Sequence, residues 1–188
     1  MVGRDAELTS LRDFVASISG GTRALVLEGE AGVGKTTVWT EGVVEAETLG
    51  LVLEARPAES ETTLSFSAAR DLLDPVLDDT LAALAPAQRR ALTRALVLDE
   101  SEGPAPDPHA VGVAVLNALR ALAAERPLVV AIDDVQWLDS ASAAAIAFAA
   151  RRLRDEPIGL LLARRSSLES GLVAELARAL GPERLRRL

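Results

Sequence analysis

Apolar residues along this chain follow two patterns in alternation, one with helical spacing and one of short unbroken runs. Near the N-terminus the aliphatic residues Leu8, Leu11, Val15 and Ile18 recur every three or four positions. This spacing predicts one face of an amphipathic helix. Short runs made up mostly of apolar residues predict four buried strands, at Ala24–Glu28, Leu51–Ala55, Leu128–Ile132 and Ile158–Ala163. Such runs are typical of parallel strands that are covered on both faces of their sheet.

The segments between these strands predict helices. The helix at Lys35–Leu49 is expected to stop at Gly50, because glycine often ends a helix. The segment Asp99–Pro106 is acidic and rich in proline, which predicts a loop. Further helices are expected at Ser67–Asp79, Pro86–Leu98, Pro108–Glu125 (capped by Asp107), Ser140–Arg154 (capped by Ser140) and Leu168–Leu180. Alternation of strands and helices predicts one α/β domain of three layers over residues 1–188, with a parallel sheet flanked by helices.

Composition narrows the class of protein. Hydrophobic residues make up 49% of the chain, enough for a buried core, and the net charge of −8 argues against nucleic-acid contact by this domain. Cysteine is absent and His109 is the only histidine, so disulfides, thiolate metal sites and a Ser-His-Asp triad are not expected. The chain opens without a signal-peptide pattern and its apolar runs are short, which predicts a cytoplasmic protein without membrane contact.

One segment carries a complete phosphate-binding motif. Gly29–Thr36 reads GEAGVGKT, which matches G-x-x-x-x-G-K-[ST] and lies between a predicted strand and a predicted helix. Backbone N–H groups of such a P-loop surround phosphate oxygens. Lys35, the only lysine among 20 basic residues, is expected to reach the β- and γ-phosphates, and the Thr36 hydroxyl to bind Mg²⁺. The predicted nucleotide-binding residues here are Gly29, Glu30, Ala31, Gly32, Val33, Gly34, Lys35, Thr36 and Thr37.

Two carboxylates follow the third predicted strand. Asp133 and Asp134 come directly after Leu128–Ile132, at the strand end where α/β folds bind ligands. This is the Walker B pattern, in which Asp133 is expected to hold Mg²⁺ through water and Asp134 to polarise the attacking water. An acidic turn without function is the alternative, and the P-loop favours the Walker B interpretation over it.

Two arginines, Arg164 and Arg165, follow the fourth predicted strand. In such sheets this strand usually lies beside the P-loop strand, and an arginine at its end can sense the γ-phosphate. Solvated or acid-paired arginines are the alternative, and the residues alone leave the two interpretations about equal.

The P-loop, the opening Val2–Leu8 (VGRDAEL) and Asp133–Asp139 (DDVQWLD) resemble the N-terminal ATPase domain of large ATP-binding LuxR-type transcriptional regulators. These belong to the STAND class of P-loop NTPases, which is related to AAA+ proteins. The resemblance covers nearly the whole chain. It implies that Gly3 and Arg4 lie near the adenine and that Arg165 is preferred to Arg164 at the γ-phosphate.

Family members continue into a fifth strand, a helical lid, a sensor domain and a DNA-binding helix-turn-helix. This chain stops at Arg184–Leu188, about where the fifth strand is expected to begin, so a domain cut before the lid is predicted. The family also implies a switch in which ADP holds a resting form and ATP, together with an inducer, permits self-association.

We therefore predict a P-loop NTPase domain that binds ATP or ADP with Mg²⁺ and hydrolyses ATP slowly, with Lys35, Asp134 and Arg165 as catalytic residues. No guanine-reading N-K-x-D stretch is present, which favours ATP over GTP. The rival interpretation is a turnover enzyme, such as a small-molecule kinase or a motor ATPase. Such an enzyme needs a closing lid, which the helices between Ser67 and Glu125 could contain.

Overall fold

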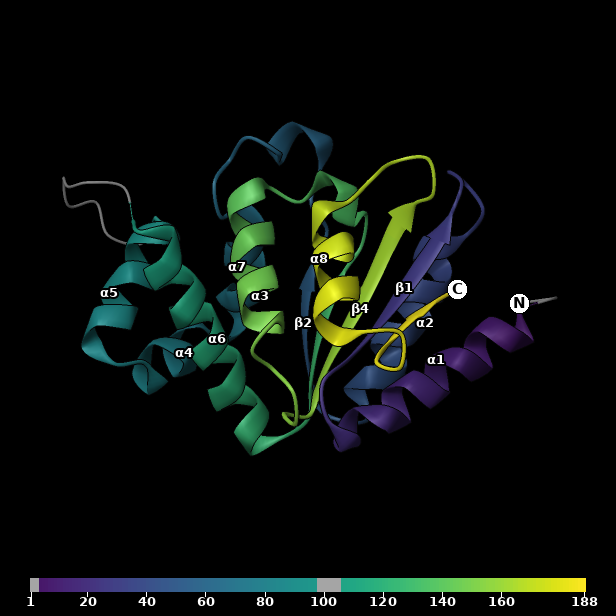
Figure 1. The fold of residues 1–188 in the computed structure, drawn as a ribbon, viewed down its shortest axis with the longest axis horizontal. Helices are drawn as coiled ribbons and strands as arrows, with labels where there is room; N and C mark the ends of the chain where they lie inside the picture. Colours follow the sequence, from purple (N-terminus) through teal and green to yellow (C-terminus); the bar gives the residue numbers. More distant parts are fainter. Residues whose placement is uncertain (1–3, 98–105) are drawn as a thin grey trace.

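The computed structural model describes residues 4–97 and 106–188, and within them five parallel strands form one sheet (Figure 1). The strands are β1 (Arg23–Gly29), β2 (Leu51–Ala55), β3 (Leu128–Ile132), β4 (Ile158–Arg165) and β5 (Leu185–Arg187). Their order across the sheet is β2-β3-β4-β1-β5. Every neighbouring pair is parallel, which confirms the predicted class of fold.

Helices cover both faces of the sheet and complete the three layers. They are α1 (Asp5–Ser17), α2 (Lys35–Glu47), α3 (Ser67–Leu73), α4 (Leu77–Ala83), α5 (Pro86–Ala95), α6 (Pro108–Glu125), α7 (Ser140–Ala150) and α8 (Gly171–Leu180). Helices α1 and α2 cover one face, whereas α3, α6, α7 and α8 cover the other (Figure 1). Helices α4 and α5 pack on α6, away from β1 and α2. None of the described helices is long and apolar enough to cross a membrane.

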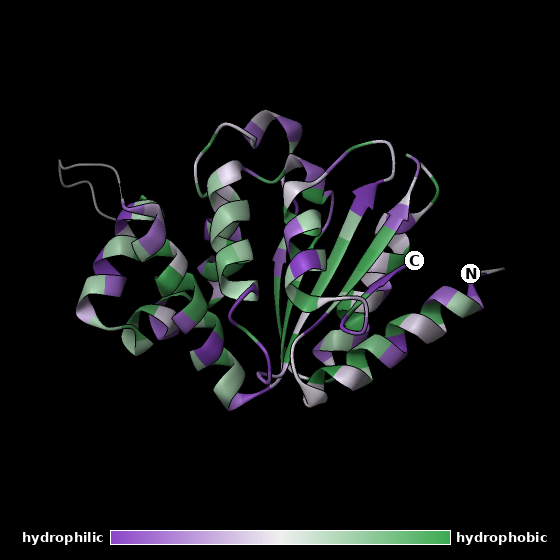
Figure 2. Ribbon diagram, viewed as in Figure 1, coloured by the Kyte–Doolittle hydropathy of each residue, from purple (hydrophilic) through white to green (hydrophobic). Residues whose placement is uncertain are grey.

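The core consists of two aliphatic clusters, one on each face of the sheet. Strand β1 shows the division, because Ala24 and Val26 belong to one cluster while Leu25 and Leu27 belong to the other. Successive side chains of a strand point to opposite faces, so an unbroken apolar run is what a doubly covered strand requires. Strands β1 and β4 are hydrophobic along most of their length and become hydrophilic at their carboxyl ends (Figure 2). Polar residues of these strands are therefore concentrated at the carboxyl ends.

The short strand β5 corrects the expectation that the chain ends before the fifth strand. Leu185 lies opposite Ala24 of β1, and the Leu188 N–H donates to the Val26 carbonyl at 2.9 Å. Only Leu185 of the three strand residues is buried, while Arg186 and Arg187 are exposed. A strand at the sheet edge with one buried residue has no apolar run by which its sequence could be recognised.

Helix boundaries also differ from the prediction. A short 3-10 helix, η3 (Asp74–Val76), separates α3 from α4, because Pro75 lacks the N–H that would continue a single helix over Ser67–Asp79. Helix α2 ends two residues early, α7 ends at Ala150, and α8 begins at Gly171. The N-cap of α7 is Asp139 and not Ser140, which is the first helical residue. Leu98 and most of Asp99–Pro106 lie outside the described residues.

Gly50 follows α2 as predicted, but for a different physical reason. It is not among the glycines with positive φ, so it does not form a left-handed helix cap. A Cβ at Gly50 would lie 2.0 Å from the carbonyl oxygen of Pro127, which accepts a hydrogen bond from the Leu51 N–H at 2.9 Å. The missing side chain therefore allows the segments that enter β2 and β3 to approach each other.

Candidate functional site

The turn between β1 and α2 has the backbone conformation of a P-loop. Gly32 and Gly34 have φ angles of 78° and 87°, in the left-handed region that glycine adopts at least cost. Gly34 is the N-cap of α2, whose first N–H groups have no partner within the helix. A helix N-terminus that follows such a loop is a preferred place for phosphate to bind.

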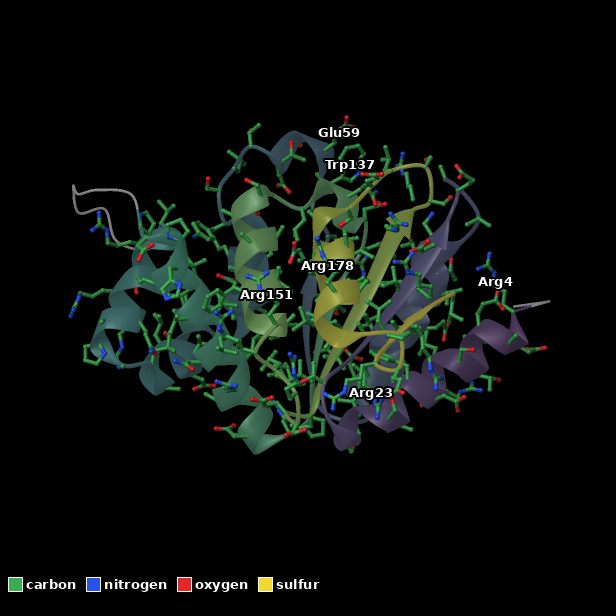
Figure 3. All side chains as sticks on the ribbon, viewed as in Figure 1. Arg4, Arg23, Glu59, Trp137, Arg151 and Arg178 are labelled. Carbon is green, nitrogen blue, oxygen red and sulfur yellow. The ribbon has the colours of Figure 1, made fainter. Side chains whose placement is uncertain are left out.

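Two cationic side chains contact the backbone of this loop. The Lys35 ammonium donates to the Glu30 carbonyl at 2.8 Å. Arg4, which precedes α1, donates a hydrogen bond to the Val33 carbonyl and would lie 3.1 Å from a Cβ at Gly34 (Figure 3). The structure thus places Arg4 against the P-loop, whereas Gly3 lies outside the described residues.

The two carboxylates after β3 have different surroundings. The Asp133 N–H donates to the Ala55 carbonyl at 3.1 Å, which continues the pairing of β3 with β2. Asp133 is only 6% exposed, and its Oδ1 accepts the Asp134 N–H at 2.9 Å. Asp134 adopts a left-handed backbone with φ of 49°, and its side chain is 38% exposed. Strained backbone of this kind is concentrated at functional sites.

The structure gives the two arginines different surroundings, and the resemblance favours Arg165 for the site. Both belong to β4, which extends two residues beyond the predicted strand. Arg164 is held by an ion pair with Glu28 at 3.1 Å. Arg165 instead lies with its Nε 4.0 Å from Asp134 Oδ1, and its guanidinium is 5.9 Å from the centre of the Trp137 ring.

A cavity of about 280 Å³ brings the main candidates together. It is lined by Ala31, Gly32, Gly34, Lys35, Thr36, Asp134 and Arg165. Two cations and one carboxylate therefore surround the N-terminus of α2, a combination that suits a multiply charged anion. The volume lies just below the ~300–1,000 Å³ of pockets that enclose a whole small ligand, so it fits the phosphate end of a larger molecule.

The other predicted residues that the structure describes lie at or near this cavity without lining it. Gly29, Glu30 and Val33 belong to the loop and Thr37 to the first turn of α2, while Asp133 is buried next to Asp134. Two larger cavities, of about 640 Å³ and 750 Å³, are lined by none of the predicted site residues. The smaller cavity therefore defines the candidate site.

The donor set of this site fits Mg²⁺. Among the described residues, no group of three or more His, Cys, Asp or Glu side chains is placed to hold a metal ion by itself. Mg²⁺ is usually bound by one or two carboxylates, while substrate phosphates and water complete its octahedron. The Thr36 hydroxyl and the two carboxylates provide the hard oxygen atoms that this ion prefers.

Two further residues contact predicted site residues, and a third anchors the DDVQWLD segment; the sequence alone did not assign these roles. Gln136 donates from Nε2 to Asp134 Oδ1 at 2.6 Å and accepts the Arg165 N–H at 3.2 Å. Ser166 donates from Oγ to the Glu30 carboxylate at 2.5 Å, which ties the end of β4 to the P-loop. The third is Asp139, the last residue of the DDVQWLD segment. The contacts of Gln136 with Arg165 and of Ser166 with Glu30 join distant segments. Only the position of Gln136 and Asp139 within DDVQWLD could have pointed to these residues.

Asp139 is a buried carboxylate from which two helices begin. It is 1% exposed and accepts the Ser142 N–H at 2.9 Å as the N-cap of α7. It also accepts the Phe66 N–H at 2.8 Å and the Ala68 N–H at 3.3 Å, at the start of α3. One side chain therefore fixes the end of the DDVQWLD segment to two helices.

We expect Asp139→Ala to lower the free energy of unfolding by about 2 kcal/mol or more, because it removes a cap and leaves buried N–H groups unpaired. Asp107→Ala is the matched control. Asp107 caps α6 from an exposed position and accepts the His109 N–H at 3.0 Å, so its loss should cost only about 0.5–1 kcal/mol. Urea unfolding of both variants measures the difference. Equal costs would contradict the double role of Asp139.

The strand order, the P-loop after β1 and the acidic pair after β3 together define a P-loop nucleotide-binding domain. The chain belongs to the AAA ATPase domain family, whose sequence model matches residues 1–162. No curated protein matches the chain. The match covers the P-loop and the acidic pair and ends within β4, before Arg165.

Proposed function

We propose that this domain is a regulatory switch that binds ATP or ADP with Mg²⁺ and hydrolyses ATP slowly. The cavity at the start of α2 carries the proposal, because it brings Lys35, Thr36, Asp134 and Arg165 together from three separate segments. Lys35 and Arg165 neutralise charge on the phosphates, and Asp134 orients the attacking water. Thr36 and Asp133 would hold Mg²⁺, which when bound would neutralise charge on the phosphate oxygens.

The contact between Arg165 and Asp134 supports a response to the γ-phosphate. Their closest charged atoms are 4.0 Å apart, so the arginine rests beside the carboxylate that acts in hydrolysis. A γ-phosphate attracts the guanidinium more strongly than one partly exposed carboxylate does, because it carries more negative charge. Binding of ATP, but not of ADP, would therefore release Asp134 from Arg165.

We further propose that the domain is the N-terminal ATPase part of a LuxR-type transcriptional regulator of the STAND class. The VGRDAEL and DDVQWLD segments support this assignment, and Arg4 of the first segment contacts the P-loop. The net charge of −8 is consistent with DNA being bound by another part of such a regulator. Nucleotide-dependent self-association and a cytoplasmic location belong to the same proposal.

The arrangement of α4 and α5 favours a switch over a turnover enzyme. A kinase closes a lid over the bound nucleotide to exclude water. Of the helices between Ser67 and Glu125, which could have contained such a lid, α3 and α6 cover one face of the sheet, and α4 and α5 pack on α6 away from β1 and α2 (Figure 1).

We expect slow turnover from the isolated domain, well below the ~1–100 s⁻¹ of kinases. Among the described residues, Arg165 is the arginine that lines the cavity. An additional arginine supplied by a partner contributes about 10³–10⁵ in rate to related enzymes. The measurement is steady-state phosphate release at saturating ATP and several protein concentrations, together with identification of any nucleotide released on denaturation. Released ADP supports the switch. Fast turnover that does not depend on protein concentration would refute it.

A further inference from the structure

We infer that Gln136 is a positioning residue for hydrolysis, which holds the Asp134 carboxylate against the carboxyl end of β4. Gln136 belongs to the 3-10 helix η4 (Val135–Trp137), two residues after Asp134. The inference rests on the proposed function, in which Asp134 orients the attacking water. It adds a residue that does not touch the nucleotide but determines where that carboxylate lies.

Both ends of the Gln136 amide are engaged, and their orientation follows from chemistry. The Arg165 backbone N–H can only donate, so it must face the amide oxygen, at 3.2 Å. The Asp134 carboxylate can only accept when ionised, so it must face the amide nitrogen, at 2.6 Å. Among side chains of this length only glutamine satisfies both partners, because glutamate lacks the donor and lysine lacks the acceptor.

The amide connects Asp134 to the P-loop through the sheet. Arg165 lies opposite Gly29 in the register of β4 and β1, and Gly29 is the first residue of the P-loop. Gln136 therefore joins the Asp134 carboxylate to the backbone of Arg165. The pairing of β4 with β1 sets the distance of that backbone from the P-loop. Asp134 has a partly exposed side chain and a left-handed backbone, and without this clamp only the Arg165 guanidinium, 4.0 Å away, would restrain its carboxylate.

Two substitutions test the clamp in different ways. Gln136→Met keeps the approximate volume and removes both hydrogen bonds, whereas Gln136→Glu keeps the acceptor for Arg165 and places a second carboxylate against Asp134. We expect kcat for ATP hydrolysis to fall about tenfold in Gln136→Met and further in Gln136→Glu. KM and the affinity for ADP should stay within about twofold. Ser140→Ala, an exposed change in the same region, is the control for kcat and for melting temperature.

The decisive comparison places Gln136→Met in an Asp134→Asn background. If Gln136 acts through Asp134, the second change should lower kcat no further, because coupled residues are not additive. Losses of kcat that multiply would overturn the inference, and so would an unchanged kcat in Gln136→Met. A lower kcat together with a weaker affinity for ADP and a lower melting temperature would show a purely structural role for Gln136. That result would also overturn the inference. If Asp134→Asn alone left hydrolysis unchanged, the proposed role of Asp134 would fail first.

Discussion

Replacing Lys35 with alanine is expected to weaken ATP binding by about 10- to 100-fold. Lys35 supplies the only ammonium at the N-terminus of α2, and a charge-assisted hydrogen bond contributes about 1.5–3 kcal/mol. The described hydrogen bond of its ammonium is to the Glu30 carbonyl, at the surface of the domain and away from the core. The folded domain should therefore keep its melting temperature while it loses affinity. Calorimetric titration with ATP and Mg²⁺ measures the effect.

A matched control distinguishes loss of the P-loop contact from a general change in net charge. Arg126 is exposed and lies just before β3, at the amino ends of the strands, whereas the cavity lies at their carboxyl ends. Arg126→Ala therefore removes the same unit of charge far from the cavity. Its ATP affinity should be unchanged. Lys35→Arg keeps the charge but introduces a planar group that does not fit between phosphate oxygens, and it should restore little of the affinity. Wild-type affinity in Lys35→Ala would mean that this loop does not bind phosphate.

Substitutions of the two carboxylates after β3 are expected to impair different steps, hydrolysis in one case and Mg²⁺-dependent binding in the other. Asp134→Asn should reduce hydrolysis by about 10²–10⁴, the range for a positioned proton-transfer group, with nucleotide affinity nearly unchanged. Asp133→Asn should instead weaken ATP binding about tenfold in Mg²⁺ and leave binding in chelator unchanged, because it removes an anionic metal partner. Single-turnover hydrolysis and titrations with and without Mg²⁺ distinguish the two.

Both asparagine variants are conservative in this structure. The amide oxygen introduced by Asp134→Asn can still accept from the Gln136 side chain, which donates to the carboxylate at 2.6 Å. The amide oxygen introduced by Asp133→Asn can likewise accept the backbone N–H of the next residue, which donates to the carboxylate at 2.9 Å. Loss of binding alone in both variants, or of hydrolysis alone in both, would contradict the division of roles.

Most of the sheet could be predicted because its interior strands are apolar on both faces. Strand β3 begins and ends at the predicted residues, since it is an unbroken apolar run between Pro127 and Asp133. The edge strand β2 also has the predicted bounds, because its mostly apolar residues lie between Gly50 and Arg56. The P-loop was equally clear, because its glycines, lysine and threonine are adjacent in the sequence and act together. Strand β5 was missed because its pairing with β1, and not its own composition, makes it a strand.

The choice between Arg164 and Arg165 shows what the chain order cannot reveal. Successive residues of a strand point to opposite faces, so only one of the two could reach the site. Which one depends on where β4 ends and on its register with β1, in which Arg164 lies opposite Glu28 and Arg165 opposite Gly29. The roles of Gln136 and Ser166 depend on the same register. Gln136 contacts Arg165, 29 residues away along the chain, and Ser166 contacts Glu30, 136 residues away.

Strand β4 also sets the distance between the two halves of the site. It lies between β1, which carries the phosphate-binding loop, and β3, which carries the acidic pair. Neighbouring strands are about 4.8 Å apart, so the two halves of the site are held roughly 10 Å from each other. That gap is wide enough for a phosphoryl group and a water molecule between loop and carboxylate. Because backbone pairing sets this width, side-chain substitutions in the site should change its chemistry without changing its span.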